Sequence, residues 1–363
     1  MHHPKNKICL VIPSLQSGGM ERVMSILAWH FAGKTEIDLH LIIYGKNREI
    51  FYSLPQDISI HKPKYLFEEN RRFWFTIKTL NFLRKEINKI KPDTILSFGE
   101  YWNSFVLLTL LGTKYPVFIS DRCQPDKVFG TFHTLLRKWL YPLAAGIIAQ
   151  SNVAKEIYLQ HKLNPNIISI GNPIRLHQDP APDKKENIIL SVGRLISTKH
   201  HDELIKLFAK IDAPDWKLIV VGTDALQQKN SIALECLVKS LNLEERVILA
   251  GQIKDIDAYY HRSKIFAFTS SSEGFPNVIG EAQSAGLPVV AFDCIAGPSD
   301  LINDGENGFL VPLFDYDTFS QRLTTLINDQ SLRTKLGNRA KETIQLFSDG
   351  GISEKYFNTI TSV

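Results

Sequence analysis

Short runs of apolar, β-favouring residues alternate with longer stretches of helical periodicity along most of the chain. The apolar runs fall at 7–13, 37–43, 58–61, 94–98, 116–120, 146–150, 166–170, 188–193, 217–221, 247–250, 265–269, 288–292 and 308–312. In the second half, the intervening helices are expected at 200–210, 225–241, 255–262, 277–285, 316–327 and 330–346. Strands that alternate with helices form parallel sheets covered by helices. The pattern therefore predicts an α/β fold.

A polar, proline-rich segment separates two such alternations. Residues 175–187 read RLHQDPAPDKKEN, a composition typical of a linker between domains. The chain has 363 residues, which is more than one core usually supports. We therefore predict two doubly wound, Rossmann-like domains, 1–175 and 176–345, that face each other across a cleft. Residues 346–363 are expected to form a final helix that can pack back on the first domain.

The segment 265–288 carries the clearest candidate chemistry. Its apolar start leads into a serine-rich turn with Glu273, and the helical pattern that follows carries Glu281 about one turn later. The carboxyl ends of strands border the ligand crevice of open α/β sheets. Two carboxylates there repel a phosphate but accept hydrogen bonds from hydroxyls, which favours a sugar or a ribose as ligand. The alternative is a solvated Glu273 and a Glu281 that only interacts with the helix dipole.

Two cations follow the first strand of the second domain. The sequence GRLISTKH places Arg194 and Lys199 after that strand, next to the start of a helix. Charge-assisted hydrogen bonds from such side chains can hold a diphosphate, and ordinary surface charge is the alternative. Cations for a diphosphate and carboxylates for hydroxyls on a nearby crossover together indicate a nucleotide diphosphate sugar.

A pair of glycines follows the first strand of the chain. Gly18 and Gly19 open a helix whose free backbone N–H groups can approach a phosphate. The turn lacks the GxGxxG of dinucleotide folds and the GK[ST] of P-loops, so it is a weak signal by itself.

Composition and charge limit the location and the partners. No apolar run approaches the about 20 residues of a membrane-spanning helix, and the start of the chain lacks the apolar region of a signal peptide, so a cytoplasmic protein is expected. Residues 1–175 carry 23 Lys and Arg against 13 Asp and Glu, and residues 176–363 carry 19 against 25. The first half is therefore expected to meet an anionic partner. Its segment 70–91, rich in basic and aromatic residues, either lies on an anionic membrane surface or is an outer helix with its aromatics in the core.

The four cysteines are far apart and form no CxxC pair. This spacing excludes a zinc ribbon and a disulfide framework. The cysteines are expected to be small, buried apolar residues.

Four segments resemble the retaining glycosyltransferases of the GT-B fold, family 4. They are SGGMER at 17–22, VGRLISTK at 192–199, EGFPNVIGE at 273–281, and AGLPVVAFD with GPSDLI at 285–302. The resemblance covers essentially the whole chain and is strongest from 188 to 312. It implies transfer of a sugar from a nucleotide diphosphate sugar, by default a UDP-sugar, to a hydroxyl of a glycan or lipid-linked acceptor. It further implies retention at the anomeric carbon and a role in surface polysaccharide or glycolipid synthesis.

The resemblance also implies roles for the matching residues. Arg194 and Lys199 would bind the diphosphate and stabilise the leaving nucleotide, Glu273 would contact the transferred sugar, and Glu281 would accept from the ribose hydroxyls. The remaining donor contacts would come from Gly18, Gly19, Gly274, Phe275, Pro276 and Asn277.

The family needs no metal, so no metal and no cofactor beyond the substrate is expected. Asp255-Ile-Asp257 and Asp315-Tyr-Asp317 are accordingly interpreted as helix N-terminal acids. Many family members carry a His in the loop after the fifth strand, but here that loop reads SDRCQPD. The acceptor-side candidates are therefore Glu100, Asp121, Arg122 and His133, of which His133 can equally be structural.

Two alternatives stay open at this point. The first is a nucleotide-sugar epimerase or hydrolase of the same fold, which would act without an acceptor. The second is a non-catalytic sugar-binding module, although such a module does not need the diphosphate-binding cations Arg194 and Lys199. No nucleic-acid partner is expected.

Overall fold

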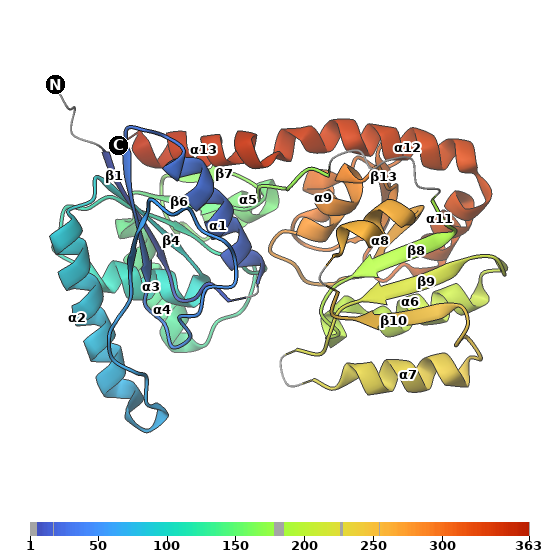
Figure 1. The fold of residues 1–363 in the computed structure, drawn as a ribbon, viewed down its shortest axis with the longest axis horizontal. Coiled ribbons are helices and arrows are strands. Elements are labelled where there is room, and N and C mark those ends of the chain that lie inside the picture. The colour runs from blue at the N-terminus through green and yellow to red at the C-terminus, as the bar shows by residue number, and fades with distance from the viewer. Residues whose placement is uncertain (1–5, 17, 178–184, 226–227, 254, 363) are drawn as a thin grey trace. The chain divides into compact units, whose positions relative to one another are not determined.

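The computed structural model describes residues 6–16, 18–177, 185–225, 228–253 and 255–362. It divides into unit 1, Met1–Pro173 with Asp349–Val363, and unit 2, Ile174–Ser348. Each unit is a parallel β-sheet with helices on both faces (Figure 1). This is the expected α/β architecture of two Rossmann-like units. The final helix belongs to unit 1 by its contacts, and the division falls close to the linker inferred from the sequence.

The sheet of unit 1 has seven strands in the order β3-β2-β1-β4-β5-β6-β7. They are β1 (Asn6–Ile12), β2 (Ile37–Ile43), β3 (Ser59–His61), β4 (Thr94–Phe98), β5 (Val117–Ser120), β6 (Gly146–Ala149) and β7 (Ile167–Ser169). All neighbouring strands pair in parallel. Because the strand order reverses between β1 and β4, the loops after these two strands border the switch point at which such sheets bind ligands.

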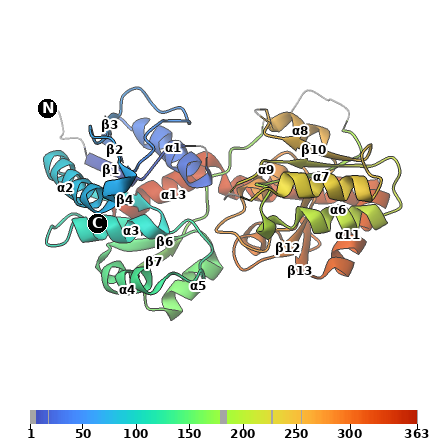
Figure 2. The same cartoon turned by 90° about the horizontal axis from the view of Figure 1, so that it is seen from below.

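Helices cover both faces of this sheet. One face packs against α2 (Arg72–Ile90), α3 (Glu100–Thr109), α4 (Thr131–Leu140) and α5 (Asn152–Gln160). On the other face, α1 (Gly19–Ala32) and α13 (Asp349–Thr361) pack against each other (Figure 2). Helix α13 buries Ile352, Tyr356 and Ile360, which are spaced four residues apart and therefore share one side of the helix.

The sheet of unit 2 has six parallel strands in the order β10-β9-β8-β11-β12-β13. They are β8 (Ile188–Val192), β9 (Lys217–Val221), β10 (Val247–Gly251), β11 (Ile265–Phe268), β12 (Val289–Asp293) and β13 (Gly308–Pro312). The order reverses between β8 and β11, which makes the loops after these strands the second switch point.

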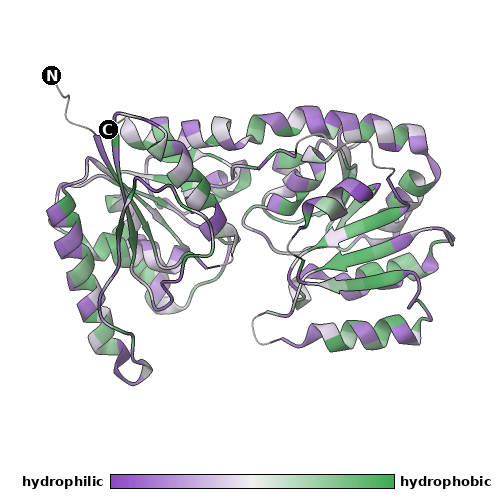
Figure 3. Ribbon diagram, viewed as in Figure 1, coloured by the Kyte–Doolittle hydropathy of each residue, from purple (hydrophilic) through white to green (hydrophobic). Residues whose placement is uncertain are grey.

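Two apolar layers enclose the sheet of unit 2. Helices α6 (His201–Lys210), α7 (Asn230–Ser240), α11 (Tyr316–Asn328) and α12 (Gln330–Thr343) cover one face. Helices α8 (Asp257–Arg262), α9 (Asn277–Ser284) and α10 (Pro298–Leu301) cover the other. The strands are accordingly apolar over most of their length (Figure 3), as expected for strands that are buried on both faces.

The helices differ from the sequence-based expectation at a few positions. The segment 70–91 forms a 3-10 turn (Glu69–Arg71) followed by the single helix α2. The helix expected over 225–241 begins at Asn230, and residues 226–227 lie outside the described residues, as do residues 178–184 of the expected linker. Helix α10 was not expected, because four residues are too few to show a helical period.

The expectation of buried cysteines holds for two of the four. Cys9 and Cys294 are buried, Cys123 is half-buried and Cys236 is exposed, and all four are free thiols. Cys236 is therefore a correction: it lies on the solvent side of α7, where helical periodicity alone does not separate a cysteine from the apolar face. Within the described ranges, no helix combines the length and the apolarity that crossing a bilayer requires.

Candidate functional site

The predicted donor-binding loops of unit 2 leave neighbouring strands. Arg194 and Lys199 follow β8, and Glu273 follows β11. The two strands pair directly, with Ile189 opposite Ile265. Both loops therefore border the switch point of this sheet, where a ligand is expected.

The two loops are joined by side-chain and backbone contacts. Lys199 Nζ and Glu273 Oε1 form an ion pair, and both side chains are 14% exposed. The backbone N–H of Ser271 donates to the carbonyl of Thr198 over 2.9 Å, and Thr269 Oγ1 donates to the carbonyl of Lys199 over 2.7 Å. These bonds fix the position of one loop relative to the other before any ligand binds, so the site is largely preformed.

Arg194 lies on a turn whose backbone needs a glycine opposite it. A Cβ atom at Gly222 would lie 1.8 Å from the carbonyl oxygen of Gly193, so only glycine allows the turns after β8 and β9 to meet. The backbone N–H of Leu195 donates to Thr223 over 2.8 Å and fastens the same turn. Arg194 itself is exposed, which leaves its guanidinium accessible to an anionic ligand.

Glu281 is a buried carboxylate one turn into α9. It is 7% exposed, and Tyr260 Oη of α8 donates to its Oε2 over 2.9 Å. Tyr260 is fully buried, so it holds this carboxylate in one orientation. An oriented carboxylate at this position can accept hydrogen bonds from vicinal hydroxyls, because each of its oxygens has more than one acceptor site.

The loop of Gly274, Phe275, Pro276 and Asn277 is held from the neighbouring crossover. Gly297, after β12, has a φ of +98°, and a Cβ there would lie 2.1 Å from Pro276 Cδ. Phe275 is 7% exposed, with its ring centroid 5.9 Å from that of Phe347. The loop is thus a packed element that ends where α9 begins, with the N-terminus of α9 directed to the same edge of the sheet.

His201, the first residue of α6, is buried next to the Arg194 turn. It is 4% exposed, and burial together with the charge of Lys199 lowers its pKa to about 4. The side chain is therefore neutral near pH 7, and Lys199 and Arg194 are the cations of this crossover. Nothing in the sequence singles out His201 or Tyr260, because only their packing in the folded unit distinguishes them.

Side chains of unit 1 contact the Gly18–Gly19 turn, where a phosphate was expected. Helix α1 begins at Gly19, as expected. Tyr52 Oη is within 3.2 Å of the Gly18 N–H and donates to the Gly18 carbonyl over 3.0 Å. A Cβ at Gly18 would lie 2.2 Å from Glu21 Oε2. The carboxylate of Glu21 therefore lies against this helix N-terminus, where the helix dipole favours a negative charge.

Asp121, an acceptor-side candidate, is the centre of a buried network. It is 2% exposed and pairs with Arg137 over 2.6 Å. Its other oxygen accepts from Tyr141 Oη over 2.7 Å and from Asn103 Nδ2 over 3.0 Å. These contacts explain the position of Asp121 without a ligand.

The other three acceptor-side candidates lie around this network. Glu100, at the start of α3, pairs with Lys127 over 3.2 Å. Arg122 places its guanidinium 3.8 Å from the ring centroid of Phe98 and donates to Asn172 Oδ1 over 2.9 Å. His133 lies in the first turn of α4, with its ring edge-on to Tyr101 at 4.8 Å. The structure thus brings Glu100 and Asp121 to one place, since Tyr141 Oη reaches both residues.

The two aspartate pairs lie at helix starts. Asp315 accepts from the Thr318 N–H over 3.0 Å and caps α11. Asp257 lies in the first turn of α8 and pairs with Arg175. Across the described ranges, no three His, Cys, Asp or Glu side chains are grouped so that they could hold a metal ion.

Comparisons with known proteins show the family of the chain. Residues 174–343 match the family Glycosyl transferases group 1, and residues 17–178 match Glycosyltransferase Family 4. A Campylobacter jejuni N-acetylgalactosamine-N,N'-diacetylbacillosaminyl-diphospho-undecaprenol 4-α-N-acetylgalactosaminyltransferase is 32% identical, over 94% of this chain and 95% of the relative. A second Campylobacter jejuni α-1,4-N-acetyl-D-galactosaminyltransferase, named for a PP-undecaprenol substrate, is 26% identical over 98% and 99%.

Solved structures show the same fold. Sucrose-phosphate synthase from Thermosynechococcus elongatus has a TM-score of 0.82 at 19% identity and covers 98% of both chains. Anabaena HepE in complex with UDP and glucose has a TM-score of 0.78 at 20% identity, over 99% of this chain and 100% of that one. The chain belongs to the glycosyl transferases group 1 and glycosyltransferase family 4, and it is a glycosyltransferase with the GT-B fold.

Proposed function

We propose that the protein transfers a sugar from a nucleotide diphosphate sugar, with UDP as the nucleotide, to a hydroxyl of a glycan or lipid-linked acceptor. The product would belong to a surface polysaccharide or a glycolipid, and the anomeric configuration would be retained. The observation that carries the proposal is the ion pair of Lys199 and Glu273, supplied by two crossovers at the switch point of unit 2. The names of the two Campylobacter jejuni relatives support a diphosphate-linked lipid acceptor.

Each site residue has a chemical task in this proposal. Arg194 and Lys199 bind the diphosphate and neutralise the negative charge that develops on it, which is usually a large share of catalysis. The bond between the anomeric carbon and the phosphate oxygen breaks, and the acceptor oxygen bonds to that carbon from the same face. The acceptor proton passes to the departing phosphate. Glu281 accepts from the ribose hydroxyls, and Glu273 accepts from a hydroxyl of the transferred sugar.

The ion pair makes these roles separable by substitution. Lys199→Ala removes a charge-assisted contact and should weaken UDP binding by about tenfold or more. Glu273→Gln leaves Lys199 without its carboxylate partner, so UDP should bind at least as tightly while transfer falls steeply. Lys239→Ala and Glu245→Gln, exposed residues of unit 2, are matched controls that should change neither quantity.

The assay uses a panel of nucleotide sugars with N-acetylgalactosamine on a short prenyl diphosphate as first acceptor, the product anomer being assigned by NMR. We expect no metal or cofactor requirement, so EDTA should leave the rate unchanged. Near wild-type transfer by both site variants would refute the assignment. Release of free sugar without transfer would replace the transferase proposal by a hydrolase.

We also propose that the protein works at the inner face of the cell membrane. The segment 70–91 was interpreted either as a helix on a membrane surface or as an outer helix with its aromatics in the core, and its aromatic residues include both exposed and buried ones. Phe75 is 3% exposed and lies in the core, whereas Phe73 and Trp74 are 72% and 63% exposed at the start of α2. Exposed aromatics next to Arg71 and Arg72 favour contact with an anionic lipid surface.

A further inference from the structure

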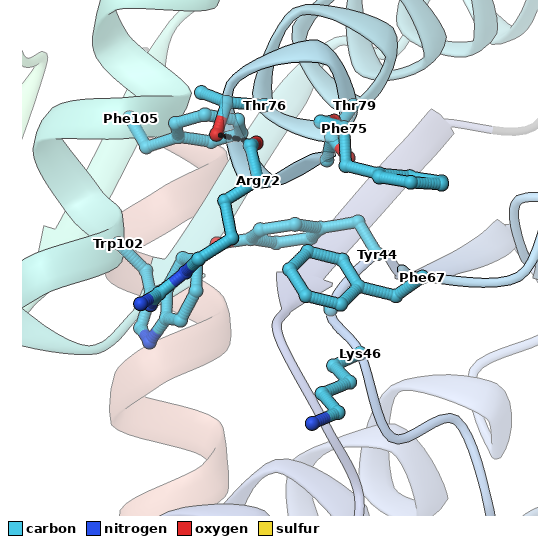
Figure 4. Close-up of a pocket in the computed structure, with 10 residues that line it drawn as sticks. Tyr44, Lys46, Phe67, Arg72, Phe75, Thr76, Thr79, Trp102 and Phe105 are labelled. Atoms are coloured by element: carbon cyan, nitrogen blue, oxygen red, sulfur yellow. Dashed lines mark hydrogen bonds between the residues drawn. The ribbon is translucent and has the colours of Figure 1, made fainter. Parts of the chain in front are cut away.

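A cavity with a volume of about 360 Å³ opens in unit 1 beside the first turn of α2 (Figure 4). Five aromatic side chains form much of its wall: Tyr44, Phe67, Phe75, Trp102 and Phe105. This volume is in the range of small-molecule sites, which are mostly apolar with a few polar groups that orient the ligand. None of the residues discussed above as donor contacts lines this cavity.

The cavity lies at the edge of the sheet where ligands are expected. Tyr44 and Lys46 belong to the loop after β2, and Trp102 lies in the first turn of α3, directly after β4. Strand β1 lies between β2 and β4. A Cβ at Gly45 would lie 2.4 Å from the carbonyl oxygen of Pro13, so the cavity loop contacts the loop after β1 directly. The cavity therefore borders the switch point of this sheet.

The rings form a surface suited to a sugar. Tyr44 is stacked on Phe105 at 5.9 Å with an interplanar angle of 9°, and it meets Trp102 edge-on at 5.8 Å. Trp102 is 41% exposed, so part of its indole remains accessible. Large, rigid rings of this kind offer apolar contact area for the C–H face of a sugar ring.

The polar groups of the cavity favour an anion that carries oxygen atoms. Figure 4 shows Arg72 extending from the first turn of α2 toward Trp102, and Lys46 extending from the loop after β2. None of the side chains found to line the cavity is acidic. Arg72 and Lys46 can therefore form charge-assisted hydrogen bonds to a phosphate.

We propose that this cavity binds a sugar that carries a phosphate, with the ring against Trp102 and the phosphate at Arg72 and Lys46. The ligand is the acceptor of the proposed function, and this identification rests on that function. A sugar without a phosphate uses the rings but not the cations, and a phosphate without a sugar leaves the rings uncovered. The cavity therefore selects the combination.

The test measures binding to the full-length protein with saturating UDP present, so that the donor site is occupied. The probes are N-acetylgalactosamine linked to a short prenyl diphosphate, N-acetylgalactosamine 1-phosphate, methyl N-acetylgalactosaminide and the prenyl diphosphate alone. The sugar phosphate should bind at least about tenfold tighter than the methyl glycoside, because charge-assisted contacts distinguish the two. The first two probes separate a lipid-linked source of the phosphate from a free one.

The variants Arg72→Gln and Lys46→Gln should each weaken binding of both sugar phosphates by about tenfold, and Trp102→Leu should weaken the methyl glycoside as well. Lys114→Gln, an exposed lysine of unit 1 outside the cavity, is the matched control and should bind as wild type. Equal binding of sugar phosphate and methyl glycoside, or equal effects of Arg72→Gln and Lys114→Gln, would overturn the proposal. If the wild type does not bind UDP, the donor assignment is refuted instead. The same titrations without UDP would still test the cavity.

Discussion

At the scale of single residues, His201 makes the stability of unit 2 depend on pH. Burial and the charge of Lys199 lower its pKa from 6.5 to about 4, so the folded protein binds fewer protons here than the unfolded chain. At a pH above 6.5 the imidazole is neutral in both states, and the fold has its full stability. As the pH falls from 6.5 toward 4, the unfolded chain takes up a proton that the folded protein does not, so stability is lost. The free energy of unfolding should therefore fall between pH 6.5 and 4, by up to roughly 3 kcal/mol from this group.

Denaturant unfolding at several pH values measures this effect. His201→Gln should flatten the pH dependence in that window, whereas His161→Gln, at an exposed position, should leave it as in the wild type. The same slope in all three proteins would show that His201 does not control the transition.

Residue type alone does not show that Glu281 is suited to ligand contact whereas Asp121 belongs to a buried network. Both acids follow strands and were candidates for ligand contact. Asp121 proves to be enclosed by Arg137, Tyr141 and Asn103, partners that come from three other segments. The sequence contains no local signal for such a network, because its members are far apart in the chain. The sequence did predict that Lys199 and Glu273 border one pocket, since neighbouring crossovers at a switch point converge, but not that the two side chains form an ion pair.

At the scale of elements, a glycine contact determines how the proposed donor-binding loops of unit 2 meet. Gly297 and Gly305 both have positive φ, +98° and +75°, but a Cβ would meet Pro276 only at Gly297, and nothing within 4 Å at Gly305. Gly297→Ala should displace the loop of Phe275 and Pro276, so the KM for the nucleotide sugar should rise and stability should fall by about 2 kcal/mol or more. Gly305→Ala carries the backbone strain without the collision.

Steady-state kinetics and unfolding of the two glycine variants test this difference. The donor KM of Gly305→Ala should match that of the wild type. An equal rise of KM in both variants would mean that backbone strain, and not the contact with Pro276, accounts for the effect.

Helices α2 and α4 both expose aromatic side chains, which allows a matched test of membrane contact. Phe73 and Trp74 of α2 are 72% and 63% exposed, and Phe132 and Trp139 of α4 are 68% and 66% exposed. The wild type should float with anionic liposomes at low salt, and Phe73→Ser with Trp74→Ser should reduce flotation several-fold, because an apolar anchor beside Arg71 and Arg72 is lost.

Phe132→Ser with Trp139→Ser is the control, since it removes the same residue types at similar exposure. A loss of flotation only in this control would assign the contact to α4. A wild type that never floats at low salt would remove the membrane proposal.

The elements themselves could be predicted closely from the sequence. Strands such as β9 and β12 are buried on both faces, so their apolar runs begin and end within a residue of the observed bounds. The cavity beside α2 could not be foreseen, because its wall combines residues from the loop after β2, from α2 and from α3. Helical periodicity also failed to separate Phe75 from Phe73 and Trp74, since all three adjoin one another in a single turn.

At the scale of the whole molecule, unit 1 depends on a helix that follows unit 2 in the chain. Helix α13 buries Ile352, Tyr356 and Ile360, and its Glu354 pairs with Lys34 over 2.8 Å. Removing residues 349–363 should therefore destabilise unit 1 by more than about 5 kcal/mol, since each fully buried side chain contributes about 1.5–3 kcal/mol.

Unit 2 keeps its own core in this truncated chain and should still bind UDP. Thermal unfolding should show an early transition that UDP does not shift and a later one that it does. The milder variant Ile352→Ala should lower the free energy of unfolding of unit 1 by about 2–5 kcal/mol. It should therefore lower the temperature of the first transition and leave that of the second unchanged. A single transition at the wild-type temperature in the truncated chain would contradict the structural role of α13.

The position of α13 also sets the order in which the two halves can be finished during synthesis. Domains ordinarily fold from the N-terminus as the ribosome extends the chain. Here the rings of Phe31 and Phe98 find their partners Phe357 and Tyr356, at 5.6 Å and 6.2 Å, only after all of unit 2 has been translated. The half of the enzyme that is made first is thus the half that is completed last.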